Sequence, residues 1–313
     1  MKVTTLRARL RALRIWWQAL RPKTLTAAVV PIIGATGLSI YEQASLQNIS
    51  YENVSLRWAV PALALVASLF IQIATNLIND VEDFKKGADT KERIGPLRVT
   101  QAGLVSSQAV QRAAVAFFLG AVLAGLPLVW IGGWPILLIG IASLLAGYSY
   151  TAGPFPLAYQ GLGDLFVVLF FGLVAVMGLN WLMTGVWSFA SVILGSQIGL
   201  HCAVLIAINN LRDYEGDRRA GKKTVAVRFG KPFGRCEILF LLLVPFSLNL
   251  YWLERGAGWA AALGLITLPW AAGLGWKIFT LEPGPAYNQL LARAAVLHFA
   301  FGVLTTVGLV LCR

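Results

Sequence analysis

Nine apolar stretches, each long enough to cross a lipid bilayer as a helix, dominate this 313-residue sequence. A hydrocarbon core requires about 20 apolar residues of helix, because backbone groups cannot remain unpaired in lipid. With 58% hydrophobic and 13% charged residues, the composition suits a chain surrounded by lipid. We therefore expect one all-α, polytopic membrane domain over residues 1–313. The expected spans are approximately 25–41, 58–78, 112–131, 134–150, 163–184, 188–208, 236–253, 258–278 and 290–312.

The basic residues lie in short blocks between the apolar stretches, which argues against nucleic acid as a partner despite the net charge of +12. If the N-terminus is cytoplasmic, 23 of the 26 Lys and Arg residues fall on the cytoplasmic side, as the positive-inside rule requires. The cytoplasmic parts are then a basic N-terminal segment, 1–23, and two loops, 79–111 and 209–235. The C-terminus is expected outside. No cleavage site of small residues follows the basic N-terminus, so we expect no removable signal peptide.

Eleven of the 14 acidic residues lie on the expected cytoplasmic side, seven of them in two clusters, although carboxylates have little part in setting orientation. The first cluster is NLINDVEDFKKGAD, residues 76–89, and the second is NNLRDYEGDRRAGKK, residues 209–223. Each continues an apolar span and each contains Asn-x-x-x-Asp, with the two copies 130 positions apart. This weak internal repeat suggests two related groups of helices that meet at a central site.

The spacing of these side chains favours a site for divalent cations. Asn209, Asp213 and Asp217 are four residues apart and would share one face of a helix, as would Asn79 and Asp83. Carboxylates held close together near a membrane repel one another unless a cation lies between them. Mg²⁺ prefers hard oxygen ligands and is usually held by one or two carboxylates together with substrate phosphates. The two stripes therefore predict Mg²⁺ ions that clamp a diphosphate, with Asp80 and Asp89 as further candidate ligands.

Basic residues among the acidic ones would supply the hydrogen-bond donors that a diphosphate needs. Arg suits bidentate contacts with phosphate, and Lys acts as a point charge. Gly87, Gly95 and Pro96 interrupt the segment 85–98, which we interpret as a loop that covers the site. The candidate diphosphate ligands are Lys23, Arg93, Arg98, Arg212 and Lys222.

Other polar residues in or near the spans have simpler interpretations. His201 and His298 lie in apolar stretches without a partner at metal-ligand spacing, so we expect packed or hydrogen-bonded residues. Asp164 follows Gly161 and Gly163 at the start of a span, where an acidic residue stabilises a helix N-terminus.

With these residues in hand, the sequence resembles the UbiA superfamily of intramembrane prenyltransferases. The first motif of that family reads N-D-x-x-D-x-x-x-D, which Asn79, Asp80 and Asp83 match, and the second contains D-x-x-x-D, which Asp213 and Asp217 match. The last aspartate of the first motif would fall at Gly87, and an aspartate stands instead at position 89. This shifted form is similar to the branch that prenylates 1,4-dihydroxy-2-naphthoate. Four blocks carry the likeness to this branch: LRPKTLTAAVVPIIGA (20–35), RIGPLRVTQAGLVS (93–106), YSYTAGPFPLAYQGLGDLFVVLFFG (148–172) and NNLRDYEGDRRAGKKTVAVRFG (209–230).

The resemblance implies about nine transmembrane helices around a central cavity, in the inner membrane of a bacterium. It implies that Mg²⁺ held by Asp83, Asp213 and Asp217 neutralises a polyprenyl diphosphate, whose allylic carbon–oxygen bond breaks. The prenyl cation would then be captured by a ring carbon of dihydroxynaphthoate, with loss of carbon dioxide. Tyr148, Tyr150 and Tyr159 are candidates for stabilising the cation or placing the acceptor.

Two alternatives remain open at the level of sequence. The acceptor could be another aromatic compound, such as 4-hydroxybenzoate or homogentisate. The protein could also be a secondary transporter, but a transporter is expected to carry its charges in the middle of its spans. Here the charges lie at the cytoplasmic ends of two spans.

Overall fold

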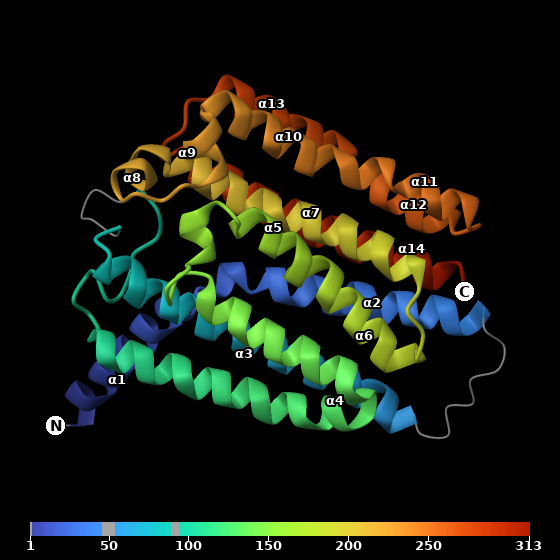
Figure 1. The fold of residues 1–313 in the computed structure, drawn as a ribbon, viewed down its shortest axis with the longest axis horizontal. Helices are drawn as coiled ribbons and strands as arrows, with labels where there is room; N and C mark the ends of the chain where they lie inside the picture. Colours follow the sequence, from blue (N-terminus) through green and yellow to red (C-terminus); the bar gives the residue numbers. More distant parts are fainter. Residues whose placement is uncertain (1, 46–53, 89–93) are drawn as a thin grey trace.

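The computed structural model describes residues 2–45, 54–88 and 94–313, and the described part consists of helices joined by short connections (Figure 1). Among the described residues, seven helical segments are long and apolar enough to cross a membrane, and one bent pair of helices adds an eighth. One of the seven is α4, Ser107–Ser149, in which Gly133 has the non-helical angles φ 69° and ψ −156°. Figure 1 shows that the chain reverses direction within α4. Counting α4 as two passes reproduces the nine spans predicted from the sequence.

The first half of the chain runs from α1 to α6, with α3 and α4 side by side and α2, α5 and α6 between them and α7, Phe189–Arg212 (Figure 1). Helix α1 is followed by the short helix η1, after which the axis bends by 48° into α2. The elements of this half are α1 (Lys2–Leu20), η1 (Pro22–Thr24), α2 (Thr26–Ser45), α3 (Val54–Lys85), α4 (Ser107–Ser149), η2 (Leu157–Gln160), α5 (Gly163–Val168), η3 (Leu169–Val174) and α6 (Ala175–Thr184). Segments α5, η3 and α6 together make one predicted span, and its middle is a turn of π-helix. π-helical turns are rare and occur frequently at functional sites.

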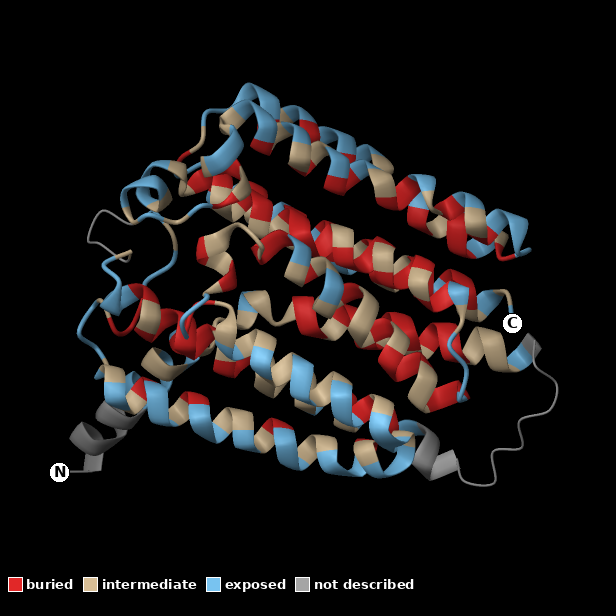
Figure 2. Ribbon diagram, in the orientation of Figure 1, coloured by how far each residue is buried: buried red, intermediate tan, exposed pale blue. Residues whose placement is uncertain are grey.

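The second half of the chain is built around α7, Phe189–Arg212, which is buried along most of its length (Figure 2). Two of the predicted spans in this half are broken into shorter helices, which the apolar pattern did not predict. The elements are α8 (Tyr214–Arg219), α9 (Val225–Phe229), α10 (Lys231–Ser247), α11 (Asn249–Glu254), α12 (Gly258–Leu265), α13 (Leu268–Thr280) and α14 (Tyr287–Leu311).

Glycines allow the central helices to approach closely. A side-chain carbon at Gly172 would lie 2.3 Å from the carbonyl oxygen of Gly195 and 2.6 Å from Cα of Gly199, so η3 and α7 are in backbone contact. A side-chain carbon at Gly37 of α2 would overlap Thr306 of α14. Small residues at helix crossings are the usual means of tight packing in membranes.

The outer faces of the bundle carry large apolar side chains, as a lipid-facing surface requires. Trp130 is 91% exposed and Leu123 is 68% exposed, both on α4. The N-terminus, α8, α9 and the ends of α3 and α7 that carry the acidic clusters lie at one end of the bundle, and the C-terminus lies at the other (Figure 1). This arrangement agrees with the predicted placement of both clusters on the side of the N-terminus.

Candidate active site

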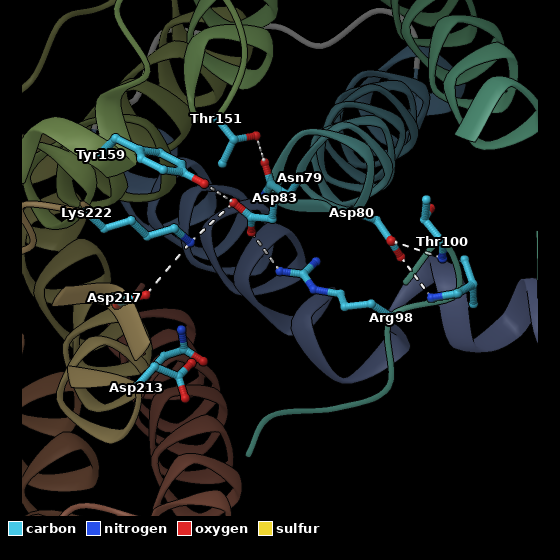
Figure 3. Close-up of polar contacts among 12 residues, drawn as sticks. Asn79, Asp80, Asp83, Arg98, Thr100, Thr151, Tyr159, Asp213, Asp217 and Lys222 are labelled. Carbon is cyan, nitrogen blue, oxygen red and sulfur yellow. Dashed lines mark hydrogen bonds and ion pairs between the residues drawn. The ribbon is translucent and has the colours of Figure 1, made fainter. Parts of the chain in front are cut away.

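The two acidic clusters meet at one end of the bundle, on the last turns of α3 and around the end of α7 (Figure 3). Helix α3 continues past the predicted span to Lys85, so Asn79, Asp80 and Asp83 are helical. Helix α7 ends at Arg212, and Asp213 joins it to α8. The predicted stripe of Asn209, Asp213 and Asp217 is therefore bent at Asp213. The four-residue spacing of the backbone hydrogen bonds continues through the bend: Asp213 N donates to Asn209 O at 3.0 Å, and Asp217 N donates to Asp213 O at 2.8 Å.

Asp83 is the centre of the contacts between the clusters. Its Oδ1 accepts a hydrogen bond from the Tyr159 hydroxyl at 2.9 Å and lies 3.2 Å from Lys222 Nζ. Its Oδ2 accepts from Arg98 Nη2 at 3.1 Å. The residue is 2% exposed, and a carboxylate buried to this extent requires compensating donors of this kind.

Lys222 connects the first cluster to the second. Its Nζ lies between Asp83 and Asp217, 3.9 Å from Asp217 Oδ1, and 4.9 Å from the centre of the Tyr159 ring. The two motifs, far apart in the sequence, therefore share one cation. Figure 3 shows Asp83, Asp217 and Lys222 pointing toward one another, with Asp213 on the same side.

Arg212 organises the remaining residues of the second cluster. It donates to both oxygens of Asp213, at 2.8 Å and 2.6 Å, and to Asn209 Oδ1 at 2.7 Å. Its Nη1 donates to Asn288 Oδ1 at 2.8 Å, and Asn288 in turn donates to the carbonyl of Ile94 at 3.1 Å. The start of α14 is thus linked to the loop that follows α3.

Asp80 and Asn79 face different partners from Asp83. The two Asp80 oxygens accept the backbone amides of Val99 and Thr100, at 3.1 Å and 3.2 Å, so Asp80 holds the loop that carries Arg98. Asn79 Oδ1 accepts a hydrogen bond from the Thr151 hydroxyl. The structure brings both residues to the site, but their side chains are engaged with the protein.

The other predicted residues are distributed as follows. Tyr159 contacts Asp83, whereas Tyr148 is 48% exposed on the outer surface. Lys23 is exposed on η1 and has no ion pair or side-chain hydrogen bond with the described residues. Arg93 and Asp89 lie outside the described residues.

An apolar cavity of about 370 Å³ lies directly beneath this charged region. Its walls come from α2, α3, α4 and the α5–η3–α6 segment, and its few polar lining residues include Thr75 and Tyr150. Thr75 is one helical turn before Asn79, and Tyr150 precedes Thr151, the partner of Asn79. The cavity therefore extends to the neighbourhood of the first acidic cluster.

The donor set fits Mg²⁺ only in combination with a phosphorylated ligand. The described residues contain no group of three or more His, Cys, Asp or Glu side chains arranged to hold a metal ion by themselves. Asp83, Asp213 and Asp217 are hard oxygen donors, but Lys222, Arg98 and Arg212 lie against them. Mg²⁺ commonly binds to one or two carboxylates and completes its octahedron with phosphate oxygens and water. Lys222, Arg98 and Arg212 would then donate hydrogen bonds to the phosphates.

Sequence reasoning did not single out three polar residues of this site. Lys86 Nζ donates to the Thr151 carbonyl and lies 4.5 Å above the Tyr159 ring. Thr151 and Asn288 bind Asn79 and Arg212. The spacing of the acidic motifs carries no signal for these residues, because their positions depend on how distant helices pack.

The comparisons with known proteins agree with this fold. The sequence profile described as the UbiA prenyltransferase family matches residues 50–310. The chain is 31% identical to a 1,4-dihydroxy-2-naphthoate octaprenyltransferase of Haemophilus influenzae, over 96% of each chain. It is 35% identical to the Escherichia coli protein of the same name, over 78% of this chain and 79% of the other. A solved UbiA homolog from Archaeoglobus fulgidus, bound to GPP and Mg²⁺, matches with a TM-score of 0.66 at 17% identity, over 95% of this chain and 99% of the other.

We call the region around Asp83, Asp217 and Lys222 the charged chamber. Next to an apolar cavity, within a helical membrane fold, it defines an integral membrane enzyme that handles a prenyl substrate. The chain belongs to the UbiA prenyltransferase family. The predicted family and the predicted all-α membrane fold are thereby confirmed, and the transporter alternative is excluded.

Proposed function

We propose that the protein transfers a polyprenyl group from its diphosphate to 1,4-dihydroxy-2-naphthoate, giving a demethylmenaquinol, the reduced form of demethylmenaquinone, with loss of carbon dioxide and pyrophosphate. The observation that carries the proposal is the meeting of Asp83, Asp217 and Lys222 at the end of the bundle toward which the apolar cavity extends. Polyprenyl diphosphates combine the same two parts, a charged head and a long apolar tail. The names of the relatives support the choice of acceptor.

The charged chamber would bind the diphosphate. Asp83, Asp213 and Asp217 would hold Mg²⁺, which supplies positive charge that stabilises the departing pyrophosphate. Lys222, Arg98 and Arg212 would donate hydrogen bonds to phosphate oxygens from the positions in which they now neutralise the carboxylates. Asp80 would act by fixing the loop that presents Arg98.

The cavity would bind the isoprenoid tail and exclude water from the allylic carbon. Phe166 and Phe170 line it with their rings stacked, 5.8 Å between centroids, and Tyr150 lies at its upper end. The negative faces of aromatic rings stabilise a cation, and a dry site prevents its capture by water. Tyr159 would hold the carboxylate of Asp83 in place through its hydroxyl.

We further propose that the enzyme lies in the inner membrane of a bacterium, with its N-terminus in the cytoplasm and its C-terminus outside. The support is the charge distribution: the Lys- and Arg-rich segments gather at the end of the bundle that holds the clusters. The water-soluble acceptor and the pyrophosphate product would then enter and leave on the cytoplasmic side.

Assays with alternative acceptors test the proposal. Purified protein in lipid nanodiscs is incubated with Mg²⁺, labelled farnesyl diphosphate and either dihydroxynaphthoate, 4-hydroxybenzoate or homogentisate. The expected product is prenylated naphthoquinol, accompanied by one carbon dioxide for each pyrophosphate. A product from hydroxybenzoate or homogentisate, and none from dihydroxynaphthoate, would contradict the assigned acceptor while leaving the family intact.

A further inference from the structure

A second buried polar group, separate from the acidic clusters, lies between α5 and α7. Asp164, in the first turn of α5, is 7% exposed. Its Oδ2 accepts a hydrogen bond from Asn210 Nδ2 at 3.3 Å, and its Oδ1 has no partner among the described residues. A buried carboxylate oxygen without a hydrogen-bond donor costs more free energy than an acidic residue contributes at a helix N-terminus. Stabilisation of α5 therefore does not by itself explain the aspartate at position 164.

Asp164 lies between a residue that lines the cavity and a residue that adjoins the second cluster. Tyr150 lines the upper end of the cavity, and its hydroxyl lies beside Gly163, where an added side-chain carbon would be only 3.0 Å away. Gly163 therefore leaves room for this hydroxyl next to Asp164. On the other side, Asn210 adjoins Asn209, which is bonded to Arg212 in the second cluster. The Tyr150 carbonyl also accepts from Ala158 N at 2.9 Å, in the loop that leads to Tyr159.

The backbone keeps this arrangement in place. Gly172, Gly195 and Gly199 bring η3 and α7 into direct contact, and this fixes α5 against the end of α7 that carries Asn210. A polar group held by rigid helices at the junction of two substrate compartments is well placed to act on the reacting atoms.

We propose that Asp164 is the catalytic base for a hydroxyl group of the aromatic acceptor, with Asn210 as its positioning residue. This inference rests on the proposed function. The bond from the allylic carbon to the diphosphate oxygen breaks, and its electron pair leaves with pyrophosphate. As the allylic carbon bonds to the ring carbon that bears the carboxylate, Asp164 takes the proton of the neighbouring hydroxyl, and the electrons of that O–H bond form a ring ketone. Carbon dioxide then leaves, its bonding electrons restore the aromatic ring, and Asp164 returns the proton to the oxygen. No proton is gained or lost overall.

Asp164→Asn keeps the shape of the side chain and removes the base. General base catalysis contributes about a hundredfold or more to a rate, so we expect kcat to fall at least a hundredfold at saturating substrates. The KM for polyprenyl diphosphate should change less than threefold, because Asp164 does not contact the diphosphate chamber directly. In the wild type, kcat/KM for the acceptor should fall at low pH as Asp164 becomes protonated, and we call this part of the pH profile the acidic limb. In Asp164→Asn the acidic limb should disappear. Asp164→Glu should restore part of the rate.

Two matched variants serve as controls. Glu42 is another carboxylate that accepts from an asparagine amide, Asn180 Nδ2, at 2.9 Å, but it lies on α2 near the opposite end of the bundle. Glu237 on α10 is a third carboxyl group, and it interacts electrostatically with Asp164. Glu42→Gln and Glu237→Gln should retain the acidic limb and the rate.

A separate variant distinguishes a base from a structural residue even if Asp164→Asn does not fold. Asn210→Leu keeps Asp164 but removes the donor that stabilises its charged form, so the acidic limb should move to higher pH. An unchanged limb in Asn210→Leu, or an Asp164→Asn enzyme with kcat within threefold of the wild type, would overturn the inference. Failure of the proposed function itself would show earlier, as absence of turnover with dihydroxynaphthoate in the wild type. In that case the same variants are compared with whichever hydroxylated acceptor the wild type converts.

Discussion

At the residue scale, Asp83 differs from its neighbours on α3 because three donors from three other segments converge on its carboxylate. Glu82 is adjacent in sequence but forms only a helical pair with Lys85 at 2.9 Å, on a more exposed face. The difference is one of direction, since residues one apart on a helix point about 100° away from each other. The two acids therefore provide a comparison within a single turn.

Asp83→Asn should reduce turnover at least a hundredfold, because one carboxylate is both the proposed ligand for Mg²⁺ and the partner of Lys222 and Arg98, and the substitution removes its charge. The matched control is Glu82→Gln, which should stay within threefold of the wild type. Steady-state kinetics in nanodiscs measures both. Equal losses in the two variants would show that the acidic character of this end of α3 matters, and not the converging contacts of Asp83.

Asp80 is expected to act on the loop and not on the metal. Asp80→Asn loses an acceptor for the amides of Val99 and Thr100, so hydrogen exchange at these two amides should accelerate at least tenfold. The concentration of Mg²⁺ that gives half-maximal activity should remain unchanged. A large rise in that concentration, with unchanged exchange, would instead identify Asp80 as a direct ligand.

At the scale of the element, the contact between η3 and α7 depends on three glycines whose Cα atoms leave no room for a side chain. The π-helical turn lies at the same place, between α5 and α6. A close helix crossing of this kind orients α5 and the cavity wall that continues from it. The sequence contains these glycines, but it does not indicate which helices they bring into contact.

Gly172→Ala should destabilise the protein by about 1–3 kcal/mol, because the added methyl group would overlap the backbone of α7. For a chain of this size each kcal/mol lowers the melting temperature by roughly 2–4 °C. Gly273→Ala on α13 is the control, since nothing lies within 4 Å of the position its methyl group would take. Thermal unfolding in detergent compares the two, and an equal melting temperature for both would contradict the close crossing.

Much of the fold was predictable because its spans are long uninterrupted apolar segments, and the acidic motifs were predictable because they stand where such segments end. The reversal at Gly133 followed from the Gly-Gly-Trp-Pro sequence between two apolar runs. What the sequence did not indicate depends on packing: the bend at Asp213, the role of Asp80 in holding a loop, and the contact of Asn288 with Arg212. These contacts join segments whose spacing along the chain carries no periodic signal.

At the scale of the whole molecule, most of the Lys and Arg residues gather at the end of the bundle that holds the acidic clusters, which supports the proposed orientation. Cys312 lies at the end of α14 and Cys202 is buried in α7, so a variant that retains only Cys312 reports on one terminus. In intact cells, a membrane-impermeant maleimide should label this variant. Labelling that requires permeabilised cells would reverse the orientation.

The proposed activity also depends on the molecule as a whole, because the cavity is lined by the first half of the chain, whereas the charged chamber is built from both halves. Asp83 and Arg98 belong to the first half, and Lys222, Asp213 and Asp217 to the second. Neither half supplies a complete site. We therefore expect turnover to require both acidic clusters, acting together through a divalent ion.

The most direct measurement is the release of pyrophosphate by purified protein in nanodiscs, with polyprenyl diphosphate and dihydroxynaphthoate, before and after exhaustive chelation with EDTA. We predict that chelation reduces release at least a hundredfold and that added Mg²⁺ restores it. Undiminished release after chelation, or no binding of the polyprenyl diphosphate to the wild-type protein, would contradict the account.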